Sequence, residues 1–199
     1  MPIKAVIFDL NGVFLLSKNL SERLAEKSDK SLEEILGVMK PILKEVRNTV
    51  RKGEEVWTPL LNLVGMRLDE FFEFYFSGES INDQMCNYAR SLRDGGFKVF
   101  TLSNNFKERT EYYRKYFPEL FEVVDKSYFS WETGFVKPDP MAFQNLLIEN
   151  DLKGEECIYV DDSEDNLEAS KEFGIKGIKY ESGEQVIEEM AKILNSSIK

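Results

Sequence analysis

Short apolar runs, rich in β-branched residues, alternate with longer amphipathic segments along most of this chain. The strongest runs lie at 3–9 (IKAVIFD), 97–103 (FKVFTLS) and 156–162 (ECIYVDD), and weaker ones lie near 122–125 and 177–180. Strands that are apolar on both faces are typical of buried parallel sheets, whose strands must be joined by crossover helices. The sequence therefore predicts an α/β fold, a doubly wound, Rossmann-like parallel sheet with helices on both faces.

The alternation is interrupted after the first run by a long block that contains no strand candidate. Helical signals fill this block: Ser31 and Glu34 have the spacing of a capping box, and Pro41 suits the first turn of another helix. The block is best explained as an insertion that returns to the sheet through the polar residues 77–80. We therefore predict a core domain of residues 1–13 and 81–199, and a helical cap of residues 14–80.

The absence of histidine narrows the chemistry of this 199-residue chain. Without histidine there can be no Ser-His-Asp triad, no Cys-His dyad and no histidine-ligated zinc site. Cys86 and Cys157 are too few for a disulfide framework or a cysteine zinc site, and we expect both to be buried thiols. Any catalysis must then depend on carboxylates, lysine, serine, asparagine and a hard metal ion.

The charge balance is acidic, with 26 Lys and Arg against 36 Asp and Glu and a formal net charge of −10. Nucleic acids and anionic membranes bind clustered basic residues, so we expect neither as a partner. No apolar stretch approaches the ~20 residues that span a bilayer, and the first predicted strand begins without a leader-like segment. These features predict a cytoplasmic protein.

Polar side chains follow the strongest predicted strands at the point where each strand ends. Asp9 ends the first, Ser103 begins the polar triplet 103–105 (SNN) after the second, and Asp161 and Asp162 end the third. Open parallel sheets bind their ligands at this carboxyl edge. Each of these groups alone is typical of a turn or a helix cap. Their convergence on one edge predicts a binding site there.

Three carboxylates at one edge favour a metal site, because Asp9, Asp161 and Asp162 repel one another unless a cation lies between them. With no histidine and only two cysteines, the expected cation is an oxygen-loving ion, and Mg²⁺ is the usual choice. Lys137, which Pro138 restricts to an extended conformation, adds another positive charge. Three carboxylates, one Mg²⁺ and one lysine sum to about zero charge, so such a site accepts a dianionic phosphate.

Four segments carry a resemblance to a known family. They are FDLNGV at 8–13, TLSNN at 101–105, GFVKPDP at 134–140 and YVDDSEDN at 159–166. They resemble, in the same order, the four motifs of the haloacid dehalogenase (HAD) superfamily, in which a small helical cap is inserted at this place in the chain. The resemblance is closest to the small-cap phosphatases. It implies a Mg²⁺-dependent hydrolase that acts on a small phosphorylated metabolite.

The resemblance implies a role for each matching residue. Asp9 matches the nucleophile, which attacks phosphorus, forms an aspartyl-phosphate and also touches Mg²⁺. Phosphoryl transfer depends mostly on positioning and charge neutralisation, which residues of these types supply. The other implied roles are phosphoryl binding for Ser103 and Asn104, neutralisation of the nucleophile and the phosphate for Lys137, Mg²⁺ ligation for Asp162 with Asp161 beside it, and support of that loop for Asn166.

One motif position departs from the family pattern. Phosphatases of this type usually carry a second aspartate two residues after the nucleophile, which protonates the leaving group, and here that residue is Asn11. An amide cannot do acid–base work, which typically contributes ~10²–10⁴-fold to the rate. The backbone carbonyl of Asn11 can still bind Mg²⁺. Two functions stay open: a phosphatase that works without this acid, or a catalytically weakened phosphate-ligand-binding or regulatory protein.

Two other kinds of protein fit the motifs less well. Haloacid dehalogenases use no metal and lack paired acids in the fourth motif, so Asp161 and Asp162 argue against them. Response-regulator receivers carry their acidic pair after the first strand and their lysine after the last. Here the acidic pair follows a later strand and Lys137 precedes it, so the order is wrong for a receiver.

Basic residues recur at helical spacing within the predicted cap, at Lys40, Lys44, Arg47 and Arg51. This stripe is either a solvated helix face or a guide for an anionic substrate. The sequence leaves both interpretations open. It also leaves open whether the protein is a monomer or a homodimer.

Overall fold

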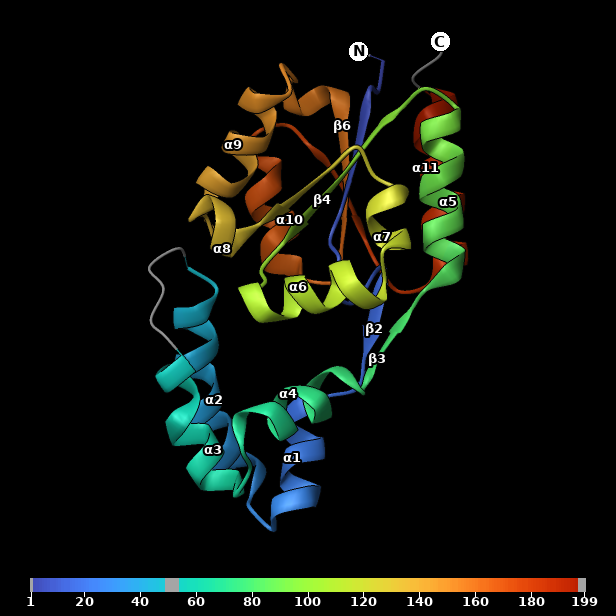
Figure 1. The fold of residues 1–199 in the computed structure, drawn as a ribbon. Coiled ribbons are helices and arrows are strands. Elements are labelled where there is room, and N and C mark those ends of the chain that lie inside the picture. The colour runs from blue at the N-terminus through green and yellow to red at the C-terminus, as the bar shows by residue number, and fades with distance from the viewer. Residues whose placement is uncertain (1, 49–53, 197–199) are drawn as a thin grey trace.

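A five-stranded parallel sheet forms the centre of the structure, a computed structural model that describes residues 2–48 and 54–196 (Figure 1). The strands lie in the order β5-β4-β1-β6-β7, and each neighbouring pair is parallel. This arrangement confirms the predicted α/β fold. The strands are β1 (Ala5–Phe8), β4 (Lys98–Ser103), β5 (Lys126–Phe129), β6 (Cys157–Asp161) and β7 (Lys176–Lys179).

The edge strand β5 lies further along the chain than the sequence predicted. The β-branched residues Val123 and Val124 suggested a strand at 122–125, but β5 begins at Lys126. Both valines are buried in the connection that leads to β5, where they pack in the hydrophobic core instead of pairing in the sheet. Burial favours the same residue types in a turn as in a strand, so this prediction was wrong by about four residues.

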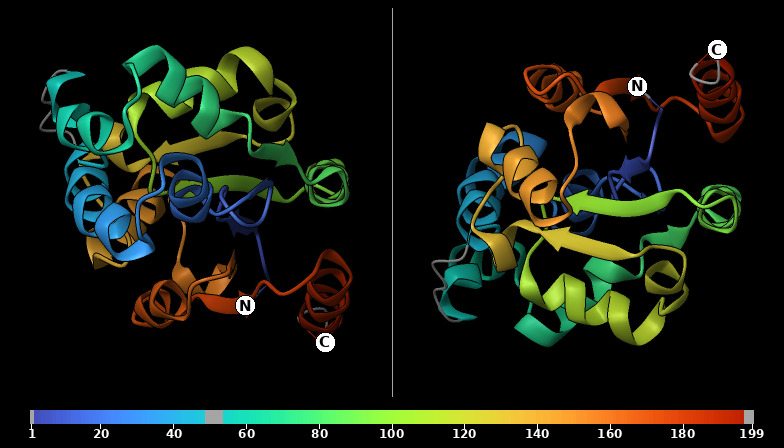
Figure 2. Two further views of the ribbon diagram at one scale, coloured as in Figure 1. Left: turned by 90° about the horizontal axis from the view of Figure 1, so that it is seen from below. Right: turned by 90° about the horizontal axis from the view of Figure 1, so that it is seen from above.

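Helices cover both faces of the sheet, as the two views of Figure 2 show. Alternate residues of β1 point to opposite faces, with Val6 and Phe8 in one hydrophobic cluster and Ala5 and Ile7 in the other. The first cluster includes side chains of α5 (Asp83–Asp94), α6 (Lys107–Tyr116), α7 (Glu119–Glu122) and α11 (Gly183–Ser196). The second includes side chains of α9 (Pro140–Glu149) and α10 (Glu164–Lys171), while α8 (Ser130–Thr133) and the 3₁₀ turn η2 (Gly154–Glu156) lie in the connections.

Between β1 and β4 the chain leaves the sheet and forms a separate group of helices, at the bottom of Figure 1. We call residues 20–48 and 54–76 the helical segment. The predicted capping box is confirmed, because Ser31 and Glu34 each bind the backbone N–H of the other. The elements of the segment are α1 (Leu20–Ser28), α2 (Leu32–Val46), the 3₁₀ turn η1 (Glu54–Trp57), α3 (Thr58–Val64) and α4 (Leu68–Phe76).

Two details of the inserted block differ from the prediction. Its ends, expected to contain no strand, pair as a short antiparallel ribbon of β2 (Leu15–Ser17) and β3 (Glu79–Ile81), because the two connections run side by side and satisfy each other's backbone groups. Pro41 lies inside α2 and not in the first turn of a new helix. The buried face formed by Met39 and Ile42 continues across Pro41, and this packing outweighs the lost hydrogen bond.

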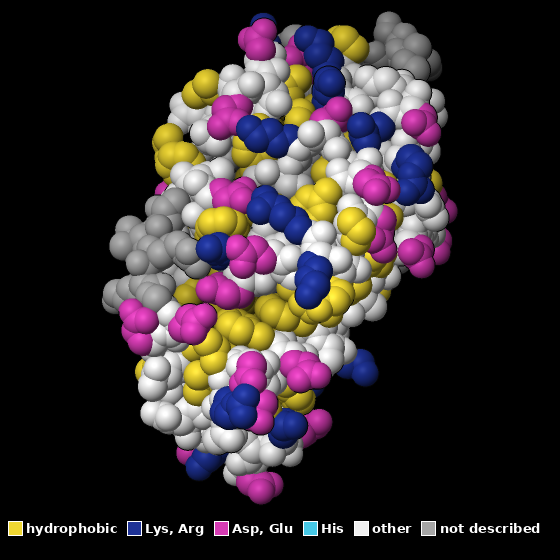
Figure 3. Space-filling model, viewed as in Figure 1, with side chains coloured by type: hydrophobic (Ala, Val, Ile, Leu, Met, Phe, Trp, Pro, Cys, Tyr) yellow, Lys and Arg dark blue, Asp and Glu magenta, His cyan; other side chains and the backbone are white. Residues whose placement is uncertain are grey.

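An aromatic cluster docks the helical segment against the carboxyl edge of the sheet. Phe106 follows the polar triplet after β4, and its ring centroid lies 5.3 Å from that of Trp57 and 5.8 Å from that of Tyr75. Phe76 of α4 also stacks on Tyr112 of α6, with centroids 4.4 Å apart. Hydrophobic side chains accordingly form a band across the molecule between the two parts (Figure 3). The helical segment therefore faces the strand ends at which the site was predicted.

Candidate functional site

The three predicted acids Asp9, Asp161 and Asp162 meet at the carboxyl edge of the sheet. Asp9 follows β1 and Asp161 ends β6, and the parallel register of these neighbouring strands brings both residues to one edge. One carboxylate oxygen from each of the three lies within 4.8 Å of the others. Asp9 and Asp161 are buried, and Asp162 is exposed. We call these residues the acidic cluster; its oxygens are close enough together to share one cation.

Lys137 supplies a positive charge to the acidic cluster. Its side chain is only 2% exposed, and its ammonium donates to Asp9 Oδ1 (2.9 Å), Asp161 Oδ2 (2.8 Å) and the Tyr159 hydroxyl (2.8 Å). Burial opposes the charge, but Asp9 and Asp161 outweigh burial and raise the pKa of Lys137 above its ordinary value. An ammonium has three donors, so these contacts use all of them and fix the group in place.

Tyr159 was not among the predicted site residues. It lies two residues before Asp161 on β6, and side chains two residues apart on a strand point to the same face. Its hydroxyl bonds to both Asp161 and Lys137. Burial raises the pKa of the phenol well above its ordinary value, so Tyr159 stays a neutral hydrogen-bonding group. The period-two spacing within YVD was the signal that could have identified it.

Further donors hold Asp161 from the helix side. The backbone N–H of Ser163 donates to Oδ1 (2.7 Å), and Nδ2 of Asn166 lies 3.2 Å from Oδ1 and 3.0 Å from Oδ2. With its lysine and tyrosine partners, Asp161 is thus surrounded by donors on both oxygens. Asp9 and Asp162 are then the carboxylates of the cluster best placed to bind a cation.

The acidic cluster carries more negative than positive charge. Burial raises the pKa of Asp9 to about 6, with Lys137 opposing this shift and Asp161 and Asp162 adding to it. Burial and Asp161 also raise the pKa of Asp162 above its ordinary value. A cation between the carboxylates would favour their ionised forms. The electrostatics and the oxygen donors of this site therefore fit a hard divalent ion.

Gly12 permits the close approach of Asp162 to the loop after β1. The φ angle of Gly12 is +95°, a region that residues with a Cβ rarely adopt. A Cβ at this position would lie 2.5 Å from Asp162 Oδ2. Both the backbone conformation and the packing therefore require glycine beside the acidic cluster.

We expect Gly12→Ala to weaken Mg²⁺ binding by roughly 10–100-fold, because the new methyl group displaces Asp162. Gly96→Ala is the matched control: Gly96 has a similar φ of +89°, and its Cβ would meet no atom within 4 Å. Both variants should lose about 1–2 kcal/mol of stability from the positive φ. Isothermal calorimetry with Mg²⁺ should separate them. Equal Mg²⁺ affinity in the two variants would contradict a role for Asp162 as a ligand.

The side chain of Asn11 is hydrogen-bonded at both ends. Its Nδ2 donates to Ser103 Oγ (3.0 Å), and its Oδ1 accepts from the Tyr113 hydroxyl (2.9 Å). Ser103, at the end of β4, is thus brought beside the loop after β1, as expected of residues on neighbouring strands. Tyr113 comes from α6 and is fully buried. No sequence pattern links Tyr113 to this site, because its place depends on how α6 packs.

Asn104 uses its side chain to hold the loop that carries Lys137. Its Nδ2 donates to the Lys137 carbonyl (2.7 Å), and its Oδ1 accepts from the Lys137 backbone N–H (2.8 Å). The next residue, Asn105, is bonded to Ser130 at the start of α8, whose Oγ accepts from the Asn105 N–H (3.1 Å). The structure therefore places Asn104 as a support for Lys137. The phosphoryl contact predicted for Asn104 stays a prediction.

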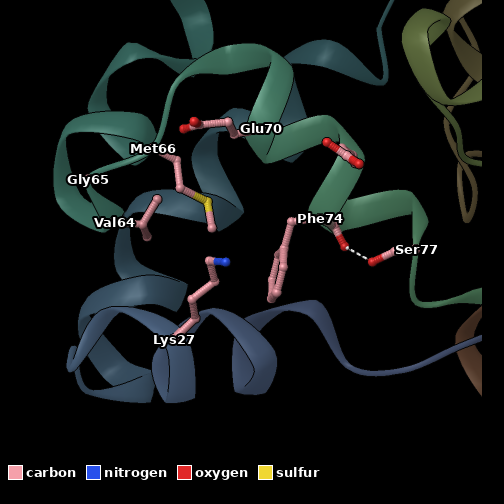
Figure 4. A pocket seen from close by; sticks show the side chains of 8 residues that line it. Lys27, Val64, Gly65, Met66, Glu70, Phe74 and Ser77 are labelled. Carbon is pink, nitrogen blue, oxygen red and sulfur yellow. Dashed lines mark hydrogen bonds between the residues drawn. The ribbon is translucent and has the colours of Figure 1, made fainter.

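A pocket of about 590 Å³ lies away from the acidic cluster, within the helical segment (Figure 4). The Lys27 ammonium lies 5.1 Å from the centre of the Phe74 ring at this pocket. None of the predicted site residues lines it. The lining residues are Lys27, Val64, Gly65, Met66, Glu70, Glu73, Phe74 and Ser77.

Comparison with known proteins agrees with the geometry of the strand ends. The family model described as haloacid dehalogenase-like hydrolase matches residues 3–174, most of the chain. The chain belongs to the haloacid dehalogenase-like hydrolases. The resemblance inferred from four short motifs is thereby confirmed. The match includes the helical segment and the strands β1, β4, β5 and β6 of the sheet, and it ends before β7.

Solved structures share the fold of this haloacid dehalogenase-like hydrolase. A HAD family enzyme from Bacteroides thetaiotaomicron has a TM-score of 0.81 at 21% identity, and the match covers 92% of this chain and 96% of that chain. The same enzyme in complex with magnesium and inorganic phosphate has a TM-score of 0.78 at 21% identity, with 91% and 96% covered. A HAD-like family hydrolase from Porphyromonas gingivalis has a TM-score of 0.81 at 23% identity, with 98% of each chain covered.

Two curated relatives match this chain over only part of their own length. Bifunctional epoxide hydrolase 2 of Rattus norvegicus is 23% identical over 97% of this chain, and the match covers 39% of that protein. The chain thus spans about two fifths of the length of this relative. D-ribitol-5-phosphate phosphatase of B. thetaiotaomicron is 32% identical over 39% of this chain and 37% of its own length. In the part of the chain that the structure describes, no helix is long and apolar enough to cross a bilayer.

Proposed function

We propose that this hydrolase is a Mg²⁺-dependent phosphatase that cleaves a small phosphomonoester through an aspartyl-phosphate on Asp9. The observation that carries the proposal is the acidic cluster with the Lys137 ammonium bonded to two of its carboxylates. Support also comes from the related fold that was crystallised with magnesium and inorganic phosphate, and from the partial match to a sugar-alcohol phosphatase.

Asp9 and Asp162 would hold the metal ion, with Asp161 beside them and the backbone carbonyl of Asn11 as a further oxygen ligand. This donor set consists of oxygens alone, which suits Mg²⁺. When bound, the ion supplies positive charge that offsets the phosphoryl oxygens and the crowded carboxylates. Lys137 adds the positive charge that the chain itself provides beside Asp9.

The chain's own residues account for the two chemical steps. An oxygen of Asp9 attacks phosphorus, and the bond between phosphorus and the leaving oxygen breaks, so that the phosphoryl group passes to Asp9. The leaving oxygen then takes up a proton from water, because Asn11 is an amide and cannot supply it. Water subsequently attacks the acyl phosphate, which releases inorganic phosphate and restores the Asp9 carboxylate. Ser103, at the end of β4, and Lys137, in the loop before α9, hold the reacting groups in place.

The helical segment acts as a cap in this proposal. It faces the carboxyl edge of the sheet and is docked there through Phe106. A cover at this position would exclude water from the phosphoryl group and contact the alcohol part of the substrate. The division into a core of residues 1–13 and 81–199 and a cap of residues 14–80 belongs to the same proposal, as does a cytoplasmic location.

A second candidate function is a catalytically weakened protein that binds a phosphorylated ligand for regulation. One observation favours it: the position of the usual acid holds an amide, and Tyr113 and Ser103 fix that amide by hydrogen bonds. In this case the site would bind phosphate and Mg²⁺ without turnover. Binding and hydrolysis measured on the same ligand distinguish the two functions.

A panel of phosphomonoesters, assayed with Mg²⁺ and with EDTA, tests the proposed function. We expect hydrolysis of at least one alkyl or aryl phosphate with Mg²⁺ and none with EDTA. Asp162→Asn should abolish the effect of Mg²⁺, whereas the matched Asp165→Asn change at an exposed residue of α10 should preserve it. Binding of phosphate ligands without any turnover would favour the regulatory alternative.

Mg²⁺ binding should weaken as the pH falls below about 6. Because the pKa of Asp9 is raised to about 6 without metal, its carboxylate is mostly protonated below that pH, and the ion must displace the proton. The affinity should fall by up to about tenfold per pH unit below this value and level off above it. Calorimetry in two buffers of different ionisation enthalpy should detect the released proton. An affinity that does not change between pH 5 and pH 8 would exclude Asp9 as a ligand.

A further inference from the structure

Arg47 ends α2 in the helical segment, and its guanidinium is partly withdrawn from solvent. The residue is the C-cap of α2, and its Nε is buried without a hydrogen-bond partner. Among the residues that the structure describes, no carboxylate forms an ion pair with Arg47. Residues 49–53 (TVRKG), which include Arg51 of the basic stripe, lie outside the described part of the chain. They contain no acid. These five residues therefore add no acidic partner, and the acids nearest to Arg47 in the sequence are Glu45, Glu54 and Glu55.

The end of α2 that carries Arg47 is the end nearer the sheet (Figure 1). Burial lowers the pKa of Arg47. Tyr75 and Asp9 favour the charged form of Arg47, and Arg109 disfavours it. Arg109 differs from Arg47 because it is already paired: its Nε donates to the buried carboxylate of Glu79 (2.7 Å). Of these two arginines, Arg47 is the one without an ion-paired acid among the described residues.

A buried guanidinium without an anion is unfavourable, and a bound anion removes that cost. The phosphoryl group that is transferred would lie at the sheet edge, against Asp9 and Lys137. Arg47 belongs to the helical segment, the part that would contact the alcohol part of a substrate in the proposed function. Its planar fork of donors suits a carboxylate or a phosphate, which it can bind through two parallel hydrogen bonds.

We propose that Arg47 binds a second anionic group on the alcohol part of the substrate, so that the preferred substrates are phosphomonoesters that carry a carboxylate or a second phosphate. This inference rests on the proposed phosphatase function and names the substrate class for the same site. It also assigns a specific role to one member of the basic stripe, whereas the exposed Lys44 has none.

Three matched three-carbon phosphates test the proposal: 3-hydroxypropyl phosphate, 3-phosphonooxypropanoate and propane-1,3-diol bisphosphate. They differ only in whether the far end is neutral, a carboxylate or a phosphate. The wild-type protein should show a higher kcat/KM on one or both anionic compounds than on the neutral one. Arg47→Gln should lower this preference by about 10–100-fold, mainly through KM, as expected for hydrogen bonds to a charged group.

Two further variants keep the outcome specific to Arg47. Lys44→Gln removes an equal charge from the exposed face of α2 and should leave the preference unchanged. Arg47→Lys keeps the charge but loses the planar fork, so it should restore only part of the preference. The carboxylate and bisphosphate arms show which anion the site prefers.

Two results overturn the proposal: a preference that survives in Arg47→Gln, or an equal loss on all three compounds, which would place Arg47 on the transferred phosphoryl group or in the fold. Failure of the phosphatase function gives a different result, since none of the compounds would then be hydrolysed with Mg²⁺. In that event calorimetric binding of the three compounds to wild-type and Arg47→Gln protein decides the question. If wild-type and Arg47→Gln protein bound the anionic compounds with equal affinity, Arg47 would not bind a second anionic group.

Discussion

Lys137→Met should abolish phosphatase activity and destabilise the fold by about 3–5 kcal/mol, because removing one partner of a buried ion pair leaves an uncompensated charge. Lys137 is the cation bonded to Asp9 and Asp161, both of which are buried. Methionine fills a similar volume without the charge. Chemical denaturation and a phosphatase assay with Mg²⁺ measure the two effects.

Lys179→Met is the matched control for this change. Lys179 pairs with Glu164 at an exposed position, where solvent screens the interaction, so its loss should alter neither the denaturation midpoint nor the activity appreciably. If the Lys137→Met protein were as stable and active as this control, the lysine would not neutralise the acidic cluster. Rescue of the Lys137→Met fold by added Mg²⁺ would support the charge argument, because the ion offsets the same carboxylates.

Asn11→Asp should raise kcat/KM on alkyl phosphates by up to ~10²–10⁴-fold and on aryl phosphates much less. An alkoxide is a strongly basic leaving group and needs a proton, whereas nitrophenolate leaves as a stable anion. The parameter kcat/KM reports the steps up to the first phosphorus–oxygen cleavage, which is where the acid acts. The measurement is kcat/KM for propyl phosphate and p-nitrophenyl phosphate in both proteins.

The hydrogen bonds around position 11 limit the expected gain. Tyr113 and Ser103 are placed to donate to a carboxylate at this position, which would favour its ionised form and weaken it as an acid. Tyr113→Phe combined with Asn11→Asp removes one of these donors and should increase the gain on alkyl phosphates. If wild-type protein hydrolyses propyl phosphate rapidly and neither variant changes the rate, another group supplies the proton.

Much of the fold could be predicted because its signals are local. The buried strands at 3–9, 97–103 and 156–162 are continuous apolar runs, as expected for a parallel sheet with both faces covered. The prediction misplaced the edge strand β5, because Val123 and Val124 suit a buried turn as well as a strand. The ribbon of β2 and β3 escaped prediction because strands of three residues carry too little periodicity to recognise.

The acids of the site and Lys137 could be predicted because strand ends converge in a parallel sheet and because a lysine offsets their charge. Their supporting contacts could be predicted only in part. Tyr159 follows from the period of a strand, but Tyr113 reaches Asn11 only through the packing of a helix, which no local pattern encodes. The burial of Arg47 Nε is likewise a feature of tertiary packing, which no local pattern encodes.

Trapping the phosphoryl group on the protein tests the central claim most directly. Wild-type protein is mixed with p-nitrophenyl phosphate and Mg²⁺, quenched in acid within milliseconds to seconds, digested and analysed by mass spectrometry. Because Asn11 cannot activate water, the acyl phosphate should persist long enough to be detected on Asp9. It should disappear with hydroxylamine, with EDTA and in Asp9→Asn. A phosphoryl group on another residue, or hydrolysis at the wild-type rate by Asp9→Asn, would contradict the assignment of Asp9 as the nucleophile.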